Sequence, residues 1–379
     1  MDVDGFATGL DRAALPAYVY DVSGLEEHVR GIVTALAGGP EVFYAAKANA
    51  DAPVLRAVGR HVAGIEVASG GELAHVRRVL PHARVAFGGP GKTDHELRLA
   101  ARLGVERVHV ESPYELRRLA DAAEAEDRDL DVLVRVNLAG ERAGAALAMT
   151  GPFGMDPALI GECLPILAAA PRLRLCGVHA HLASGLDVPA LIAQHREVLA
   201  WARPWLAQAG VARPEINLGG GMAVDYAAPE DRFDWPAYGK ALSSLARPDE
   251  TLRIEPGRAV TVYHGWYVTD VLDIKTAHDA AYAVLRGGTH HLRTPATKNH
   301  DHPFRALPGP RTPHAPYVHD RPVTLVGQLC TPKDVLARDI PLERLHVGDR
   351  VVFAMAGAYA WNISHHGFLM HPAPTFHYL

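Results

Sequence analysis

The chain has 379 residues, of which 48% are hydrophobic and 21% are charged. This length and composition allow two buried cores, or one large barrel with an appendage, and exclude a disordered chain. The net charge of −5 argues against electrostatic binding of nucleic acid. Three cysteines without a CxxC pair exclude a disulfide framework and a cysteine-rich zinc site.

The sequence shows no targeting or membrane signal. Its N-terminus is acidic and lacks a basic segment followed by an apolar run. The longest apolar stretch, Val351 to Trp361, has 11 residues, fewer than the ~18 that span a bilayer. We therefore expect a cytoplasmic protein with no membrane partner and no nucleic-acid partner.

Between about residue 40 and residue 260, short apolar runs alternate with amphipathic helical stretches. The runs are Val42–Ala46, Gly64–Ala68, Arg84–Phe87, Arg107–Val110, Asp131–Val136, Arg174–His179, Glu215–Leu218 and Leu252–Glu255. Several are too apolar to alternate, which is typical of parallel strands buried on both faces. Eight strand–helix units predict an α/β fold with a closed (β/α)8 barrel of the TIM type, and a doubly wound open sheet is the alternative.

After about residue 262, prolines and glycines become frequent and helical periodicity fades. Strand-like runs at Tyr267–Ile274, Val323–Val326 and Arg350–Ala354 predict a mostly antiparallel β domain. Ala17–Asp21 is also strand-like and precedes the barrel. We predict a barrel over residues 26–262 and a discontinuous β domain over residues 1–25 and 263–379.

The active site of a β/α barrel lies at the carboxyl ends of its strands, and the unusual residues of this chain follow its predicted strands. Lys47 ends the first strand among alanines. Burial there would lower the pKa of its amine and prepare it to form a Schiff base with an aldehyde. A surface lysine that extends its charge to solvent is the alternative.

Other strand ends also carry polar residues. They are Glu66, Arg135, His179, His181 and Ser184. The two histidines are two residues apart, so both side chains are expected to face the barrel interior, although hydrogen-bonded core histidines are the alternative. No third ligand accompanies them at metal-ligand spacing, so we expect no metal site.

Two glycine-containing turns complete this set of candidates. Gly219–Gly221 follow the seventh strand and let the backbone direct its N–H groups at an anion such as phosphate, although a plain turn is the alternative. The eighth strand ends with Glu255, and Gly257 and Arg258 follow. These two turns therefore add a carboxylate, Glu255, and a cation, Arg258, to a glycine-rich backbone.

Together these residues supply the parts that hold pyridoxal 5′-phosphate (PLP): an aldehyde-reactive lysine, a phosphate cradle, an arginine and a carboxylate. A carboxylate such as Glu255 would keep the pyridine nitrogen protonated, which makes the ring a strong electron acceptor. An arginine in its place would favour racemisation, so Glu255 favours a more demanding step such as decarboxylation. We expect the ring of His181 to stack on the cofactor.

In their order and spacing these residues resemble the PLP fold-type III decarboxylases, which include the ornithine and diaminopimelate decarboxylases. The resemblance covers nearly the whole chain. It is carried by Tyr44–Asn49, Ile65–Glu72, Arg135–Asn137, His181–Ser184, Leu218–Gly221, Glu255–Arg258, Cys330 and Gly357–Tyr359.

The resemblance implies a role for each candidate. Lys47 carries the Schiff base, His181 stacks on the ring and Glu255 meets the pyridine nitrogen. The residues implied at the cofactor and its phosphate are Glu66, Arg135, Ser184, Gly219, Gly220, Gly221, Gly257, Arg258 and Tyr359. Cys330 enters the active site of a partner subunit and donates a proton there, which implies a head-to-tail homodimer with shared sites. A buried small hydrophobic residue is the alternative for Cys330.

The substrate is indicated by a departure from the family pattern. Thr331 follows Cys330, where simple amino-acid decarboxylases usually have an acid that holds the distal amine of the substrate. Gly287–Ala296 and Ser364–Pro372 resemble instead the citryl-diaminopropionate decarboxylases of carboxylate siderophore assembly.

A citryl tail is polyanionic and needs cationic or hydrogen-bonding partners. The candidates for substrate binding are His290, His291, Arg293, Thr331 and Asp334, with Lys298, His300 and His302 nearby. A solvated surface loop is the alternative for the histidine-rich segment.

Two further functions stay open at this stage. One is a diaminopimelate, ornithine or lysine decarboxylase, or an amino-acid racemase, on the same fold. Glu255 argues against the racemase and Thr331 against the diamino acids. The other is a PLP carrier without turnover, against which the C-terminal domain with Cys330 argues.

Overall fold

The fold is taken from a computed structural model that describes residues 1–140, 144–149, 151–293 and 301–379. These residues form two compact units. The barrel unit comprises Glu26–Val224 and Arg232–Val260, and the β unit comprises Met1–Leu25, Asp225–Asp231 and Thr261–Leu379. Lys298 and His300, which we expected near the substrate, lie outside the described residues.

The predicted barrel is confirmed. Eight parallel strands close in the order β10-β11-β2-β3-β4-β5-β6-β8. Their bounds are β2 (Glu41–Ala45), β3 (Gly64–Val67), β4 (Val85–Phe87), β5 (Arg107–Val110), β6 (Leu130–Arg135), β8 (Leu173–His179), β10 (Glu215–Asn217) and β11 (Thr251–Ile254). Because β11 pairs with β2, the ring has no free edge and the open-sheet alternative is wrong.

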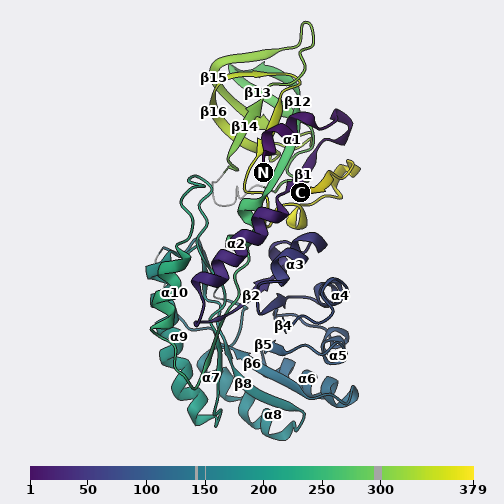
Figure 1. Cartoon of the computed structure of the whole chain (residues 1–379). Helices are drawn as coiled ribbons and strands as arrows, with labels where there is room; N and C mark the ends of the chain where they lie inside the picture. The colour runs from purple at the N-terminus through teal and green to yellow at the C-terminus, as the bar shows by residue number, and fades with distance from the viewer. Residues whose placement is uncertain (141–143, 150, 294–300) are drawn as a thin grey trace. The chain divides into compact units, whose positions relative to one another are not determined.

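Helices follow the strands and lie outside the ring (Figure 1). In the barrel unit they are α3 (Ala52–Gly59), α4 (Gly70–Val79), α5 (Asp94–Arg102), α6 (Pro113–Ala125), α7 (Pro157–Gly161), α8 (Cys163–Ala169), α9 (Val188–Gln208) and α10 (Trp235–Ser243). The remaining helices are α1 (Val3–Gly9), α2 (Val22–Ala35) and α11 (Arg258–Thr261). Two strands of two residues each, β7 (Leu147–Ala148) and β9 (Ala183–Ser184), pair in a small separate ladder.

The helix starts show how local sequence sets the boundaries. Thr93 and Glu96 form a complete capping box at the start of α5. Ser112 caps α6 through its side chain in the same way, but among the described residues Glu115 forms no return bond that would complete a capping box there. The carboxylate of Glu115 instead accepts a 2.6 Å hydrogen bond from the buried ammonium of Lys92. A buried cation needs a partner more than a backbone N–H does, so the ion pair takes the carboxylate.

The β unit is mostly antiparallel. Its strands are β1 (Ala17–Tyr20), β12 (Gly265–Ala277), β13 (Ala280–Leu285), β14 (Phe304–Leu307), β15 (Tyr317–Val326), β16 (Val335–His346), β17 (Arg350–Phe353) and β18 (Thr375–Tyr378). The N-terminal strand β1 pairs antiparallel with β12 and parallel with β18. Strand β13 also pairs in parallel with β15. Segments from both ends of the chain therefore build one sheet.

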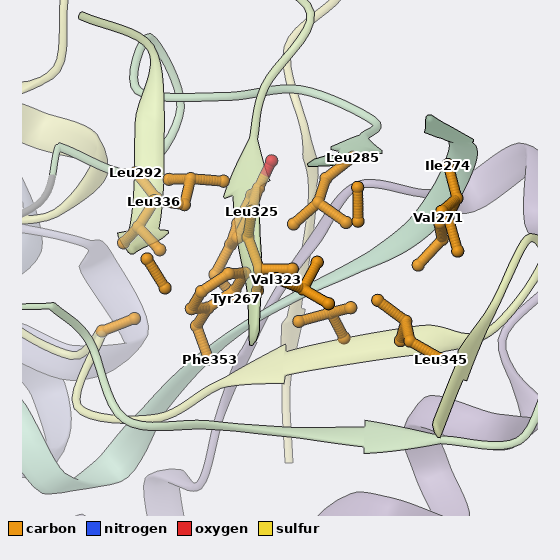
Figure 2. Close-up of a cluster of buried hydrophobic side chains, with 14 of the residues drawn as sticks. Tyr267, Val271, Ile274, Leu285, Leu292, Val323, Leu325, Leu336, Leu345 and Phe353 are labelled. Atoms are coloured by element: carbon orange, nitrogen blue, oxygen red, sulfur yellow. The ribbon is translucent and has the colours of Figure 1, made fainter. Parts of the chain in front are cut away.

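The β unit has its own apolar core, part of which is drawn in Figure 2. Tyr267 and Phe353 pack there with Leu285, Leu325 and Leu345, all of them buried. Burial of such side chains contributes roughly 1.5–3 kcal/mol each, so this sheet can hold the loops between its strands in fixed positions. Among the described residues, no helix is both long and apolar enough to cross a membrane.

Candidate active site

Lys47 lies in a short 3₁₀ turn, Ala46–Ala48, directly after β2. Its Nζ donates a 2.8 Å hydrogen bond to Oε2 of Glu66, the third of the four residues of the neighbouring strand β3. The side chain of Lys47 is 46% exposed and that of Glu66 only 5%. Of the two alternatives for Lys47, the structure therefore agrees with the lysine that extends its charge to solvent and not with the buried one. The turn directs the amine outward from the strand end, and a buried carboxylate holds it.

Burial raises the pKa of the Glu66 carboxyl, and the positive charge of Lys47 opposes that rise. The pair thus combines an accessible amine with a carboxyl group that has little access to water. Such an amine can react with an aldehyde while its position stays fixed.

Glu255 follows β11 and is buried, with 8% of its surface exposed. Asn217 of β10 donates its Nδ2–H to Oε1 of Glu255 at 2.7 Å. His179, the last residue of β8, has its Nε2 3.2 Å from Oε2. Asn217 lies on β10, which is next to β11 in the barrel, and His179 lies on β8, which is the next strand beyond β10. The last residues of β10 and β8 therefore hold the carboxylate beside the carboxyl end of β11.

His181 is fixed at both ring nitrogens. Its Nδ1 accepts the backbone N–H of Gly220 at 3.2 Å, and its Nε2 lies 3.3 Å from Oγ of Ser184. Burial lowers the pKa of His181 to about 3, so the ring is neutral at pH 7. Because Nδ1 accepts, the proton is on Nε2, which donates to Ser184. The site thus contains a flat, uncharged ring of fixed orientation.

The glycine loop after β10 lies directly against its neighbours. Gly219 and Gly221 have φ of +69° and +106°, which favours glycine. A Cβ on Gly219, Gly220 or Gly221 would lie 2.6, 2.5 or 2.4 Å from a backbone carbonyl oxygen of an adjacent strand end. No larger residue fits, and Asn217 Oδ1 further anchors the loop by accepting the N–H of Gly219 at 3.0 Å. The N–H groups of Gly219 and Gly220 thus already donate to Asn217 and His181, and phosphate binding by this loop stays a prediction.

Arg135 ends β6 and pairs with Glu111, since its Nη1 donates to Oε1 of Glu111 at 2.7 Å. The other oxygen of Glu111 accepts the N–H of Gly154 at 2.9 Å. Both side chains are buried. The structure thus gives Arg135 a local partner, and its contact with a cofactor stays a prediction. Gly257 and Arg258 follow Glu255, and Arg258 begins α11.

The remaining candidates belong to the β unit. Tyr359 lies in the loop after β17 with a φ of +50°, and Cys330 is exposed in the turn between β15 and β16. His290 and His291 are buried with their ring centroids 3.9 Å apart. The backbone N–H of Arg293 donates to Ser364 Oγ at 2.9 Å. The roles predicted for these residues stay predictions.

Thr331 and Asp334 lie in the same turn as Cys330, between β15 and β16. Oγ1 of Thr331 accepts the backbone N–H of Lys333 at 3.4 Å. Asp334 is buried and its carboxylate is surrounded by hydrogen-bond donors of its own unit. The described histidine His302 is buried as well, and its Nδ1 lies 3.1 Å from the carbonyl oxygen of Ala354.

Sequence reasoning missed several polar residues of the barrel interior. They are Lys92, His109, Glu111 and Asn217. Each lies within or directly after a predicted strand or at a helix start, where a polar residue in an apolar context is unusual. His109 matters most, because its Nε2 lies 3.7 Å from Oε1 of Glu255. With His179 it brings a set of two histidines and one carboxylate together, with ligand atoms within 4.8 Å of one another.

A (β/α)8 barrel with a lysine, a buried carboxylate and a tightly packed glycine loop at its strand ends defines a class of PLP enzyme. These residues fit that cofactor: an amine for its aldehyde, a carboxylate for its ring nitrogen and a loop without side chains where its phosphate can approach the backbone. Residues 22–262 match the family described as pyridoxal-dependent decarboxylase, pyridoxal binding domain. The chain belongs to this family, and the predicted family, enzyme class and cofactor are confirmed.

Relatives cover almost the whole chain. A 2-[(L-alanin-3-ylcarbamoyl)methyl]-2-hydroxybutanedioate decarboxylase of Staphylococcus aureus is 41% identical over 96% of this chain and 93% of its own length. A diaminopimelate decarboxylase of Actinosynnema pretiosum is 33% identical over 92% of this chain and 80% of its own. A diaminopimelate decarboxylase of Helicobacter pylori, solved with L-lysine, is similar in fold with a TM-score of 0.86 at 23% identity, covering 99% of this chain and 93% of that one.

Proposed function

We propose that this protein decarboxylates a citrate amide of 2,3-diaminopropionate, or a close analogue, in carboxylate siderophore biosynthesis. The observation that carries the proposal is the 41% identity, over 96% of the chain, to the Staphylococcus aureus enzyme. The name of that enzyme describes such an amide: an alanin-3-yl group joined through a carbamoyl to a hydroxylated polycarboxylate. The Thr331 that follows Cys330 supports the same substrate, because it leaves the distal end without an acid.

When bound, PLP supplies an electron sink for the bond between Cα and the departing carboxylate. In the proposed site Lys47 would hold the cofactor through the aldehyde of PLP, and Glu66 holds the amine of Lys47 in position. Glu255, held by Asn217 and His179, would pair with the pyridine nitrogen. A carboxylate there favours the protonated nitrogen and so the stronger electron sink.

The proposed phosphate cradle uses the glycine loop, with Ser184, Arg258 and Tyr359 around it. The neutral ring of His181 has no charge to desolvate, so it can pack flat against a second ring. Arg135 and Gly257 complete the proposed cofactor pocket.

Substrate carboxylates are proposed to bind near His290, His291 and Arg293. Asp334 is itself an acid, so we propose that it does not bind these carboxylates directly. It would instead position the substrate-binding residues by accepting the backbone N–H groups of Thr289 and Leu329. After carbon dioxide leaves, Cα needs a proton, and the exposed thiol of Cys330 is the proposed donor. We propose that this thiol serves the site of a second copy of the chain in a homodimer. We also propose that the enzyme works in the cytoplasm on a small-molecule substrate.

The test is a substrate panel with the purified protein and PLP. We expect carbon dioxide and the corresponding amine from the citrate amide, identified by mass spectrometry. The Lys47→Ala variant serves as control and should release none, and borohydride reduction should label the wild type at Lys47 alone. Release only from diaminopimelate, ornithine or lysine would contradict the assignment.

A diamino-acid decarboxylase is the second candidate, favoured by the 33% identity to a diaminopimelate decarboxylase. The same panel separates the two candidates by their products. A racemase would return the D-amino acid without carbon dioxide. A PLP carrier would give neither product, yet would bind the cofactor.

A further inference from the structure

Behind Glu255 lies a buried pair of histidines that the proposed function does not yet explain in full. The rings of His109 and His179 are stacked with centroids 4.3 Å apart and planes 13° from parallel. His109 comes from β5 and His179 from β8, which are separated in the barrel by β6. Both side chains are essentially inaccessible, with 1% and 5% of their surface exposed. The contact therefore reaches across the barrel interior.

The hydrogen bonds fix the state of His179. Burial lowers its pKa well below the usual range, so the ring is neutral. A carboxylate accepts only, so the single ring proton must be on Nε2, which lies 3.2 Å from Oε2 of Glu255. Its Nδ1 is buried without a hydrogen bond. Nothing bonded to Nδ1 holds this ring in its plane, so packing must do so.

His109 supplies that packing and is itself held from behind. Burial lowers the pKa of His109 well below its usual range too, so the stack carries no repulsion between two cations. The ammonium of Lys92 donates to the backbone carbonyl of His109 at 2.8 Å and to Glu115 at 2.6 Å. Lys92 also donates to the carbonyl of Gly89 at 2.7 Å. The backbone that carries His109 is thus fixed by a buried ion pair.

A metal ion is the competing explanation for two histidines and a carboxylate within 4.8 Å of one another. Metal ligation needs each nitrogen lone pair, which lies in its ring plane, to converge on one point about 2.1 Å away. Parallel rings 4.3 Å apart direct their lone pairs side by side instead. The observed geometry is that of a stack, and a metal would require one ring to rotate.

We propose that His109 is a positioning residue for Glu255: its ring packs on His179, holds the Nε2–H of His179 on the carboxylate, and so keeps Glu255 directed at the ring nitrogen of the cofactor. The inference rests on the proposed function, because it assumes that Glu255 pairs with that nitrogen. It predicts that replacing His109 weakens cofactor binding only when the cofactor has its ring nitrogen, and only when the new side chain lacks a flat ring.

The experiment compares two ligands of the cofactor-free protein: PLP, and a deaza analogue in which CH replaces the ring nitrogen. Affinities are measured by equilibrium dialysis for the wild type, His109→Leu and His109→Phe. His109→Leu should weaken PLP binding about tenfold, as is typical when a contact within a hydrogen-bonded network is lost, and leave the analogue unchanged. His109→Phe keeps a stacked ring and should restore most of the affinity for PLP.

The matched control is His195→Leu. His195 is also fully buried and neutral, but it lies on helix α9 and its Nε2 contacts the hydroxyl of Tyr238. This variant should lower stability without changing the ratio of the two affinities. A second measurement, the ¹⁵N chemical shift of PLP labelled at the ring nitrogen, should move toward the unprotonated value in His109→Leu and not in His195→Leu.

Two outcomes would overturn the inference. One is an equal loss of affinity for both ligands in His109→Leu, which would make the residue merely structural. The other is an unchanged affinity ratio together with an unchanged ¹⁵N shift. Failure of the proposed function looks different, because the wild type would then release no carbon dioxide from the citrate amide, while the affinity ratios and the ¹⁵N shifts of the variants would still follow the pattern expected here.

Discussion

Asp334 and Thr289 are joined by two hydrogen bonds, since Oδ1 of Asp334 accepts the backbone N–H of Thr289 at 2.6 Å and its hydroxyl at 2.8 Å. The other carboxylate oxygen accepts the N–H of Leu329 at 2.8 Å. Asp334 therefore ties the turn before His290 to the turn that carries Cys330. One buried carboxylate fixes the relative positions of a proposed substrate-binding residue and of the proposed proton donor.

Replacing Asp334 with alanine should destabilise the β unit and lower turnover. Three donors lose a charged acceptor, which should cost about 3 kcal/mol of unfolding free energy. Urea unfolding and turnover of the citrate amide check this expectation. Glu343→Ala, at an exposed position of β16, is the control and should change neither quantity. A stable Asp334→Ala variant with normal turnover would contradict the assigned tie.

Cys330→Ala tests the proposed proton donor. The variant should keep bound PLP but lose about 10²- to 10⁴-fold in turnover, because a positioned acid is missing when Cα needs its proton. Cys176→Ala is the control, since this free thiol lies on β8 of the barrel and is partly buried. Steady-state rates together with the absorbance of bound PLP separate a loss of chemistry from a loss of cofactor. Full activity of Cys330→Ala would remove the thiol from the reaction.

Thr331→Glu tests how the chain selects its substrate. An added carboxylate would repel a polyanionic tail and offer a partner to a distal amine. Like charges that face each other directly cost several kcal/mol of binding free energy. We expect kcat/KM for the citrate amide to fall at least about tenfold and kcat/KM for diaminopimelate to rise. Thr331→Ser keeps the hydroxyl and should preserve the original ratio. If Thr331→Glu left the ratio of the two kcat/KM values unaltered, the tail of the substrate would have to bind away from position 331.

The barrel could be predicted from sequence because its signals are local. Each of the eight strands is a short apolar run followed by a turn and a helix start, and each predicted run overlaps an observed strand. Lys47, the glycine loop and Glu255 each follow one of these strands. Because the parallel strands close into a barrel, their carboxyl ends lie on one face, and these residues are brought together there.

Contacts across the barrel could not be predicted in this way. His109 stacks on His179 from two strands that lie far apart in sequence, and no local pattern marks such a pair. Sequence alone leaves the exposure of Lys47 open between two alternatives, because it depends on a 3₁₀ turn of three residues that no local pattern marks. Asp334 was singled out for substrate binding, whereas its hydrogen bonds are local to its own turns.

The amino ends of the barrel strands contain a buried charge network. Arg253 is fully buried and forms ion pairs with Glu41 at 2.8 Å, Glu106 at 2.9 Å and Glu215 at 3.0 Å. Arg253→Leu would leave these carboxylates without their shared cation and should cost about 3–5 kcal/mol of unfolding free energy. Arg174→Leu removes a largely exposed guanidinium and should cost about 1 kcal/mol or less. Equal losses in urea unfolding would contradict the distinction.

Buried histidines should make the barrel sensitive to acid. Burial lowers the pKa of His195 to about 3, whereas an unfolded histidine titrates near ~6.5. As the pH falls below ~6.5, the unfolded chain takes up a proton that the folded chain refuses, so stability is lost between ~6.5 and about 3. One such histidine should account for about 1 kcal/mol of the loss between pH ~7 and ~5.5.

His195→Leu isolates that contribution, because the variant cannot take up this proton in either state. Its free energy of unfolding in urea should be lower than that of the wild type at pH ~7, since the hydrogen bond to Tyr238 is lost. Between pH ~7 and ~5.5 it should then fall by about 1 kcal/mol less than the wild type does. The matched variant Tyr238→Phe removes the same hydrogen bond but keeps the histidine, so it should retain the wild-type pH dependence. If His195→Leu and the wild type lost equal stability over this range, the ring of His195 would have to be protonated in the folded barrel.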